Sequence, residues 1–213
     1  MVKTMHTQKP EYTETEIKIL RAARKIFLQK GYSGARMQEI ANEANINKAL
    51  LHYYFRSKER LFQGIFSEAL HTMFPMLMNI LKSDLSFYEK IYKVFDAQID
   101  FLRENKDMPL FLMQEAKNRK EFLFETLKQY DPLMQTRIVE QIQELIDKGE
   151  IRPIDPRQLL MNVISLSVFP FAGEPILKFM LHVSDQEFDD MIEARKKILP
   201  EFVINAIKIQ SHD

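Results

Sequence analysis

The pattern of apolar and polar positions along the chain predicts a protein built from helices. In residues 13–30, apolar side chains recur three or four positions apart, as they do on one face of an amphipathic helix. Similar spacing returns further along the chain. No stretch alternates convincingly with the period of two that marks a strand. We therefore expect an all-α protein of about nine helices.

Capping signals divide the chain into these helices. Three Ser/Thr-x-x-Glu sequences have the form of a capping box, in which the two side chains satisfy backbone N–H groups at a helix start. They are Thr13 with Glu16, Ser86 with Glu89, and Ser184 with Glu187. Asp131-Pro132 and Asp155-Pro156 each place a cap before a proline at the first helical position. Gly31 and Gly149 are expected to end helices.

Residues 37–61 contain two short helical segments and the start of a longer one. A helix over 37–44 and a second helix after Asn47 are separated by Asn45, Ile46 and Asn47 alone. Asparagine tolerates the left-handed backbone of a tight turn and also caps a following helix. With the longer helix over 13–30 as a brace, this is the plan of a helix-turn-helix, whose second helix lies in the major groove of DNA.

The distribution of charge supports a polyanionic partner. The net charge is zero, yet residues 1–60 carry 12 Lys and Arg against 6 Asp and Glu, which gives +6. Residues 61–213 carry the remaining 18 against 24, which gives −6. A basic head on an acidic body is the electrostatic footprint expected of a protein that binds nucleic acid through one end.

One face of the second short helix is not required for packing within the fold. Leu51 falls on its packing face, whereas Lys48, Ala49, His52 and Tyr53 fall on the opposite face, with Leu50 at the border. Lysine can reach guanine acceptors or a phosphate, and alanine lets the helix approach a thymine methyl group. His52 and Tyr53 can donate to phosphate oxygens. We interpret this face as the one that reads DNA.

Residues outside this helix complete the expected DNA-binding set. Lys58 lies in the first turn of the next helix, where free N–H groups and the helix dipole attract a phosphate. Arg36 and Gln38 begin the preceding helix and can reach the DNA backbone and base edges respectively. The full set is Arg36, Gln38, Asn47, Lys48, Ala49, Leu50, His52, Tyr53, Tyr54 and Lys58.

Residues 14–61 resemble the DNA-binding domain of the TetR family of transcriptional regulators. The stretch AARKIFLQKGYSGARMQEIANEANINKALLHYYFRSKERL follows that family's order of first helix, Gly-aromatic, Ile-Ala, turn, aromatic cluster ending in Phe, and then Ser-Lys-Glu and Leu. The resemblance implies a homodimeric and usually repressing regulator whose helical body binds a small effector. It also implies that Gln38, Lys48 and Ala49 face bases, while Tyr53, Tyr54 and Lys58 mainly hold phosphates.

The sequence departs from the family pattern at several positions. Asn45 stands where the family usually has Gly, and Asn47 where it has Ser or Thr; both suit the turn and the cap. Leu50 replaces Thr or a similar residue. His52 replaces Tyr and is not its equivalent at a phosphate. Arg36, where Ser or Thr often contacts the backbone, is expected to take over that phosphate by charge.

The domain organisation expected from these features has three parts: a flexible arm over 1–13, a DNA-binding domain over 14–60, and a helical effector-binding and dimerisation domain over 61–213. Residues 159–171 are apolar on nearly every side, and the last helix carries a wide apolar stripe. Intramolecular packing would explain both. We favour a dimer interface, because a two-fold protein can present two recognition helices to a palindromic operator. Its expected residues are Leu160, Val163, Ile164, Ser167, Phe188, Ile192, Leu199 and Phe202.

The body is also rich in side chains that suit an apolar or aromatic ligand. Residues 61–213 contain 9 Met and 14 Phe, which can line a pocket or simply fill the core. The hypothesis is that an effector lodged beside Phe66, His71 and Met73 swings the head and releases the DNA. The expected ligand-binding residues are Phe66, His71, Met73, Phe95, Phe111, Met113 and Phe122.

Two other classes of function remain as alternatives. Glu68 and His71 form a Glu-x-x-His pair, the unit of a metal-carboxylate helical-bundle enzyme, but such a site needs a second pair and two further glutamates. A membrane-surface module would need a broad amphipathic basic helix. The chain has no cysteine, no secretory signal and no long apolar span. We expect a cytoplasmic protein that is not an enzyme, with no cofactor and no membrane partner.

Overall fold

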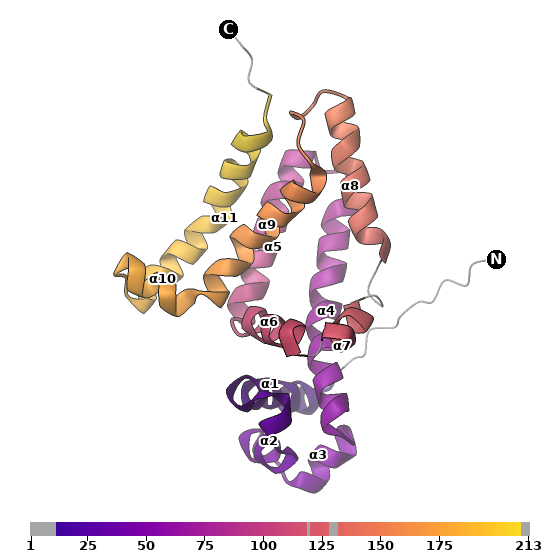
Figure 1. Cartoon of the computed structure of the whole chain (residues 1–213), viewed down its shortest axis with the longest axis vertical. Coiled ribbons are helices and arrows are strands. Elements are labelled where there is room, and N and C mark those ends of the chain that lie inside the picture. Colours follow the sequence, from indigo (N-terminus) through magenta and orange to yellow (C-terminus); the bar gives the residue numbers. More distant parts are fainter. Residues whose placement is uncertain (1–11, 119, 128–131, 210–213) are drawn as a thin grey trace, which may run out of the picture. The chain divides into compact units, whose positions relative to one another are not determined.

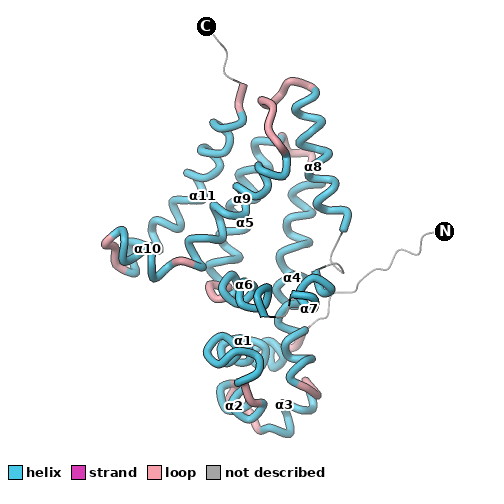
Figure 2. Tube along the Cα trace, viewed as in Figure 1, coloured by secondary structure: helices cyan, strands magenta, loops and turns pink. Residues whose placement is uncertain are grey.

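The protein is helical throughout the part that the structure describes. The computed structural model describes residues 12–118, 120–127 and 132–209. These residues form helices and contain no strand, which confirms the all-α prediction (Figures 1 and 2). They divide into two compact units, Met1–Thr72 and Met73–Asp213, with the boundary inside one long helix. The expected arm over 1–13 lies almost wholly outside the described residues.

The first unit contains α1 (Glu14–Gly34), α2 (Met37–Glu43), α3 (Lys48–Tyr54) and the beginning of α4 (Lys58–Lys82). The second unit contains the end of α4, α5 (Phe87–Glu104), α6 (Met108–Asn118), α7 (Lys120–Leu127), α8 (Pro132–Asp147), α9 (Pro156–Ala172), α10 (Glu174–Leu181) and α11 (Asp185–Ile207).

The helix starts follow the capping residues. All three capping boxes are present, so the hydroxyl groups of Thr13, Ser86 and Ser184 each accept a backbone N–H three residues on. The carboxylate of Asp155 caps α9 by accepting the N–H of Arg157 at 2.9 Å. These predictions are confirmed. Asp131 lies outside the described residues, and α8 begins at Pro132.

Glycines lie at two breaks between helical segments, one inside α1 and one between α9 and α10. Gly31 has the left-handed φ of 68° inside α1, so the regular helix breaks where predicted, although helical turns resume as far as Gly34. Gly173 ends α9 and begins α10, and Pro175 then stands in the first turn of α10.

The first unit has a close-packed apolar core. Its most buried side chains, exposed by no more than 1%, are Ile19, Leu20, Ala23, Phe27, Ile40, Ala41, Ala44, Leu51, Leu61, Phe62 and Ile65. At Gly64 an added Cβ would lie 2.8 Å from Cδ2 of Leu20 and 3.2 Å from Cε1 of Phe55. Because Gly64 has no side chain, α4 can approach α1 and Phe55, just after α3, closely. This close packing holds the end of α3 against α4.

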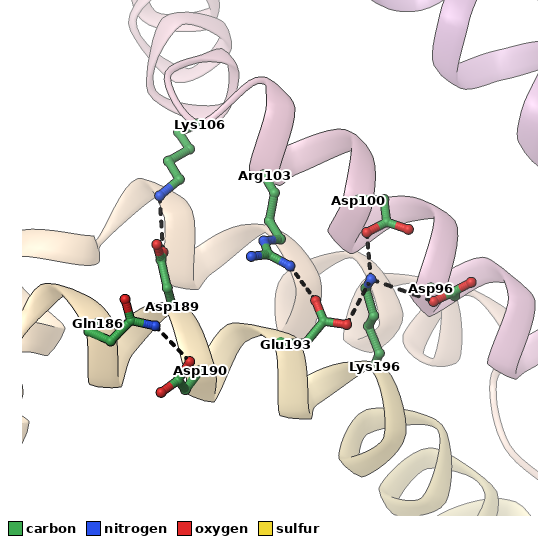
Figure 3. A network of polar contacts seen from close by, with 9 residues as sticks. All are labelled: Asp96, Asp100, Arg103, Lys106, Gln186, Asp189, Asp190, Glu193 and Lys196. Carbon is green, nitrogen blue, oxygen red and sulfur yellow. Dashed lines mark hydrogen bonds and ion pairs between the residues drawn. The ribbon is translucent and has the colours of Figure 1, made fainter.

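In the second unit, α5 and α11 pack against each other, and both contact α9. Ion pairs lie along the solvent side of the α5–α11 contact (Figure 3). Lys196 Nζ lies 2.5 Å from Asp100 Oδ1 and 3.1 Å from Glu193 Oε1, and Lys106 Nζ lies 3.0 Å from Asp189 Oδ1. Arg103 pairs with Glu193. These charges align α11 on α5.

The short helix α10 is tied to the start of α11 by one lysine. Lys178 pairs with Glu174 and Asp185, and its ammonium lies 5.2 Å from the ring centroid of Phe188. The two carboxylates raise the pKa of Lys178. No single helix of the described residues has the length and hydropathy of a membrane span, and the bent pair α9 and α10 meets that test by length and composition only.

Candidate nucleic-acid interface

Packing and capping fix α3 from one side. The Asn47 side chain accepts the N–H of Leu50 at 2.7 Å and so caps the helix as predicted. Asn45, in the turn before it, has the predicted left-handed backbone with φ of 52°. Leu51 is fully buried and Phe55, just after the helix, is 5% exposed. These anchors leave the opposite face of α3 in solvent.

That opposite face carries the predicted readers. Lys48, Ala49 and His52 are exposed, and Leu50 is at the border of exposure. Tyr53 is 78% exposed, which is a high fraction for an aromatic ring. Displaying this ring to solvent does not stabilise the chain itself. The half-buried Tyr54 ring contacts the Tyr53 ring edge-on, with centroids 5.2 Å apart. Tyr54 therefore supports Tyr53 rather than projecting as far itself.

The start of α2 presents two more of the predicted residues. The Gln38 amide donates to Asn42 Oδ1 at 2.9 Å, which holds this exposed side chain along the helix. Arg36 is exposed, and its backbone N–H donates to Glu39. A hydrogen bond from Lys30 is the main reason that the pKa of Glu39 is lowered. The Glu39 carboxylate is therefore paired within the protein. It adjoins Arg36, which is expected to contact a phosphate.

Lys58 begins α4, as predicted, and its ammonium contacts the protein itself. Its ammonium donates to the carbonyl oxygens of Tyr32 at 2.7 Å, Ala35 at 3.1 Å and Ser33 at 3.4 Å. It also lies 4.5 Å from the centroid of the Tyr32 ring. An ammonium has three donors, so these carbonyls use them all. In this structure the side chain fastens α4 to the end of α1 and to Ala35 just after it; a contact between Lys58 and phosphate stays a prediction.

Two arginines near α3 were missing from the predicted set. Arg56, in the loop after α3, and Arg60, in the first turn of α4, are both exposed. Between them, Ser57 caps α4 by accepting the Arg60 N–H at 3.2 Å. The sequence held the signal, because Arg56 and Arg60 flank the capped helix start at which Lys58 was expected to bind phosphate. They carry the exposed positive charge there in its place.

The predicted effector residues do not form one described cluster. Phe95 on α5 and Phe111 on α6 are fully buried, while Met113 on α6 is 60% exposed. Met73 on α4 is half-buried. The side chains of Phe66, His71 and Phe122 lie outside the described part of the structure. Phe95 and Phe111 therefore serve as core residues in this conformation.

The predicted dimer residues separate into two groups. Ser167, Phe188, Ile192 and Leu199 are at most 3% exposed within a single chain, so they pack inside their own unit and offer no surface to a partner. This corrects their assignment. Ile164 and Phe202 are 46% and 62% exposed, and Leu160 and Val163 are intermediate.

Other apolar residues of α9, α10 and α11 are exposed as well as Ile164 and Phe202. We name the following exposed residues of α9, α10 and α11 the C-terminal apolar face: Met161, Ile164, Phe169, Ile176, Phe179, Met180, Leu181, Met191, Ile198 and Phe202. Phe179 and Met180 are 79% and 67% exposed. Periodicity had indicated which helices carry this surface, but it did not indicate which side of each helix faces outward.

The alternative metal site gains no support from the geometry. Among the described residues, no group of three His, Cys, Asp or Glu side chains lies close enough together to hold a metal ion. The Glu68 and His71 pair stays untested, because the His71 side chain lies outside the described part of the structure.

Comparisons with known proteins cover both units. Residues 19–65 match the profile of bacterial regulatory proteins of the tetR family, and residues 88–203 match that of the tetracyclin repressor-like C-terminal domain. The uncharacterised HTH-type transcriptional regulator YhgD of Bacillus subtilis is 28% identical over 151 residues, which are 70% of this chain and 78% of that protein.

Two further matches concern a named repressor. The HTH-type transcriptional repressor KstR2 of Mycolicibacterium smegmatis is 26% identical over 142 residues, covering 63% of this chain and 66% of that protein. The solved structure of the ketosteroid transcriptional regulator KstR2 of Mycobacterium tuberculosis superposes with a TM-score of 0.70 at 15% identity, covering 94% of this chain and 98% of that one. At this identity the superposition shows a shared fold.

Proposed function

The chain belongs to the TetR family of transcriptional regulators, and we propose that it acts as a homodimeric repressor that binds a palindromic operator through α3 and leaves it when an effector binds. The observation that carries this proposal is the solvent face of α3. The exposed residues of α3 are Lys48, Ala49, His52 and Tyr53. Asn47 caps this helix, and the buried side chain of Leu51 anchors its other face in the core. A rigid helix with such a face suits the major groove.

We assign different tasks to the exposed residues. Lys48, Ala49 and Gln38 face base edges, where lysine recognises guanine acceptors and glutamine recognises adenine. Tyr53 and His52 donate to phosphate oxygens, and Arg36, Arg56 and Arg60 supply positive charge along the DNA backbone. Phosphate contacts set the position of the protein on the duplex, and base contacts set its sequence preference. Asn47, Leu50 and Tyr54 shape α3 rather than read DNA.

The second copy of the chain binds at the C-terminal apolar face. The exposed parts of Phe169, Phe179 and Phe202 amount to roughly 400 Å² if a phenylalanine offers about 200 Å². The aliphatic residues of the face add a similar area, which brings it near the ~800 Å² that each partner buries in a standard interface. A C2 dimer uses the same face on both copies and presents two α3 helices to the two halves of a palindrome.

The effector in this proposal is an apolar or aromatic small molecule that binds in the second unit. Phe95 and Phe111 supply large apolar side chains there, and both are fully buried. A ligand that inserts beside them has to displace packed side chains, so it favours a different arrangement of the helices around it. Only such a difference in affinity between two arrangements can change DNA binding. Repression is chosen as the sign of regulation because the similar protein KstR2 is named a transcriptional repressor.

DNA binding by reader variants tests the proposal. Once an operator duplex has been selected, its affinity is measured by fluorescence anisotropy at one salt concentration for Lys48→Ala, Tyr53→Ala and the control Lys18→Ala, an exposed lysine on α1. We expect both reader variants to lose at least about ten-fold in affinity, as loss of about 1.4 kcal/mol does, while the control binds as the wild type. Unchanged specific binding by both reader variants would refute the assignment of α3.

A further inference from the structure

A proline inside α9 leaves one backbone carbonyl without its usual donor. Pro170 lies within the helix that ends at Ala172, and it is buried. In a regular helix the N–H of residue 170 would donate to the carbonyl of residue 166. Proline has no N–H, so the carbonyl oxygen of Leu166 must find another donor or remain unsatisfied.

An arginine of α11 supplies that donor. Nη2 of Arg195 donates to the Leu166 carbonyl oxygen at 2.8 Å. Burial lowers the pKa of Arg195, and its Nε, which is also buried, has no hydrogen-bond partner among the described residues. Burying part of a guanidinium costs free energy unless hydrogen bonds replace its lost hydration. The contact joins α11 to α9 at the site of the missing helical bond.

Arg195 also occupies a particular place on α11. Met191, Ile198 and Phe202 lie four positions before it and three and seven positions after it, so all four share one side of the helix. The three apolar residues are 43%, 55% and 62% exposed and belong to the C-terminal apolar face. On α9, Ile164 and Phe169 are also exposed, two positions before and three positions after Leu166 in the sequence.

We propose that Arg195 is a positioning residue of the dimer interface: by bonding the carbonyl that Pro170 leaves free, it holds α9 beside α11 so that their exposed apolar residues form a single surface for the second copy. The inference rests on the proposed homodimer. Without the Arg195 contact, α9 and α11 keep their apolar residues but lose the register between them. The shape complementarity between the apolar faces of the two copies then falls.

A double-mutant cycle tests this role. Arg195→Met keeps an unbranched apolar chain and removes the donor, and we expect the dimer dissociation constant to rise about ten-fold or more, because the part-buried hydrogen bond that holds α9 beside α11 is lost. Pro170→Ala restores an N–H to α9, which can satisfy Leu166 within the helix. The double variant, Pro170→Ala with Arg195→Met, should therefore recover most of the wild-type affinity. The constants are measured by analytical ultracentrifugation over a dilution series.

Further variants and a second readout separate the outcomes. Arg195→Lys keeps one donor and should dimerise nearly as the wild type. Arg195→Leu, which also has no donor, replaces Arg195→Met in the cycle if the latter does not fold, as judged by circular dichroism. Unchanged dimerisation of the Arg195 variant overturns the inference, as does a double variant no better than the single one. A monomeric wild-type protein would instead refute the proposed homodimer.

Discussion

Two lysines of the first unit provide a matched test of the assignments at the DNA interface. Lys48 is exposed on the proposed reading face of α3, whereas the Lys58 ammonium donates to three backbone carbonyls at the end of α1 and just after it. Substituting either lysine by methionine removes one positive charge and keeps a similar aliphatic length. The two variants therefore differ only in what the lost ammonium touched.

The expected magnitudes follow from those contacts. Hydrogen bonds to a charged group contribute about 1.5–3 kcal/mol when buried, and those of Lys58 are only partly buried. We therefore expect Lys58→Met to reduce the free energy of unfolding by about 1–2 kcal/mol, or about 2–8 °C in Tm for a chain of this size. Lys48→Met should leave Tm unchanged. Because Lys48 is assigned to a base edge, its loss should reduce discrimination at one guanine of the operator by about 1–3 kcal/mol and leave the slope of log K against log salt nearly unchanged.

The assay combines thermal unfolding with operator binding at four salt concentrations for both variants. Lys58→Met is expected to keep the wild-type salt slope at temperatures where it is folded, because its ammonium does not face the DNA. A lower salt slope for Lys58→Met with unchanged Tm would show that Lys58 binds phosphate and that its carbonyl contacts are incidental. The structural role expected of Lys58 would then be wrong.

Three further predictions concern a base reader, the two sides of α11 and an ion pair. Gln38→Ala should reduce discrimination at one base pair of the operator by about 1–3 kcal/mol; an unchanged sequence preference in a selection experiment would remove Gln38 from the readers. Leu199→Ala should reduce the unfolding free energy by about 2–5 kcal/mol, whereas Phe202→Ala should mainly weaken dimerisation, and the reverse pattern in unfolding and dilution experiments would contradict the observed orientation of α11. The hydrogen bond from Lys106 lowers the pKa of Asp189, so its stabilisation is present above the ordinary value of about 3.9 and is lost as pH falls through the lower folded value. Asp189→Asn should therefore reduce the loss of stability on acidification in urea titrations, and an unchanged pH profile would show that the pair contributes nothing.

Local signals in the sequence were sufficient to predict most helix starts and the geometry of the turn before α3. Thr13, Ser86 and Ser184 cap helices because a hydroxyl and a glutamate three residues later satisfy each other's backbone donors. Asn45 adopts its left-handed backbone for an equally local reason. These interactions depend on neighbours in the sequence, so a pattern can reveal them.

Features that depend on distant residues could not be read in the same way. The sequence placed Lys58 at a helix start, where an anion is favoured, but the carbonyls it binds belong to residues more than twenty positions earlier. Likewise, Leu199 and Phe202 both fit the apolar spacing of α11, and only the packing of α5 against α11 decides that the first is buried and the second exposed. Periodicity identifies an apolar stripe without identifying what covers each part of it.

The central claim is that two copies of α3 read the two halves of one DNA site. Its most direct test is selection of bound duplexes from a random pool at a fixed salt concentration, followed by affinity measurements on the enriched sequence and a scrambled version. The account predicts an enriched palindrome whose half-sites lie about 34–36 Å apart, or a multiple of that distance, and binding at least about 10³-fold tighter than to the scrambled duplex. Equal affinity for the enriched and scrambled duplexes would contradict it.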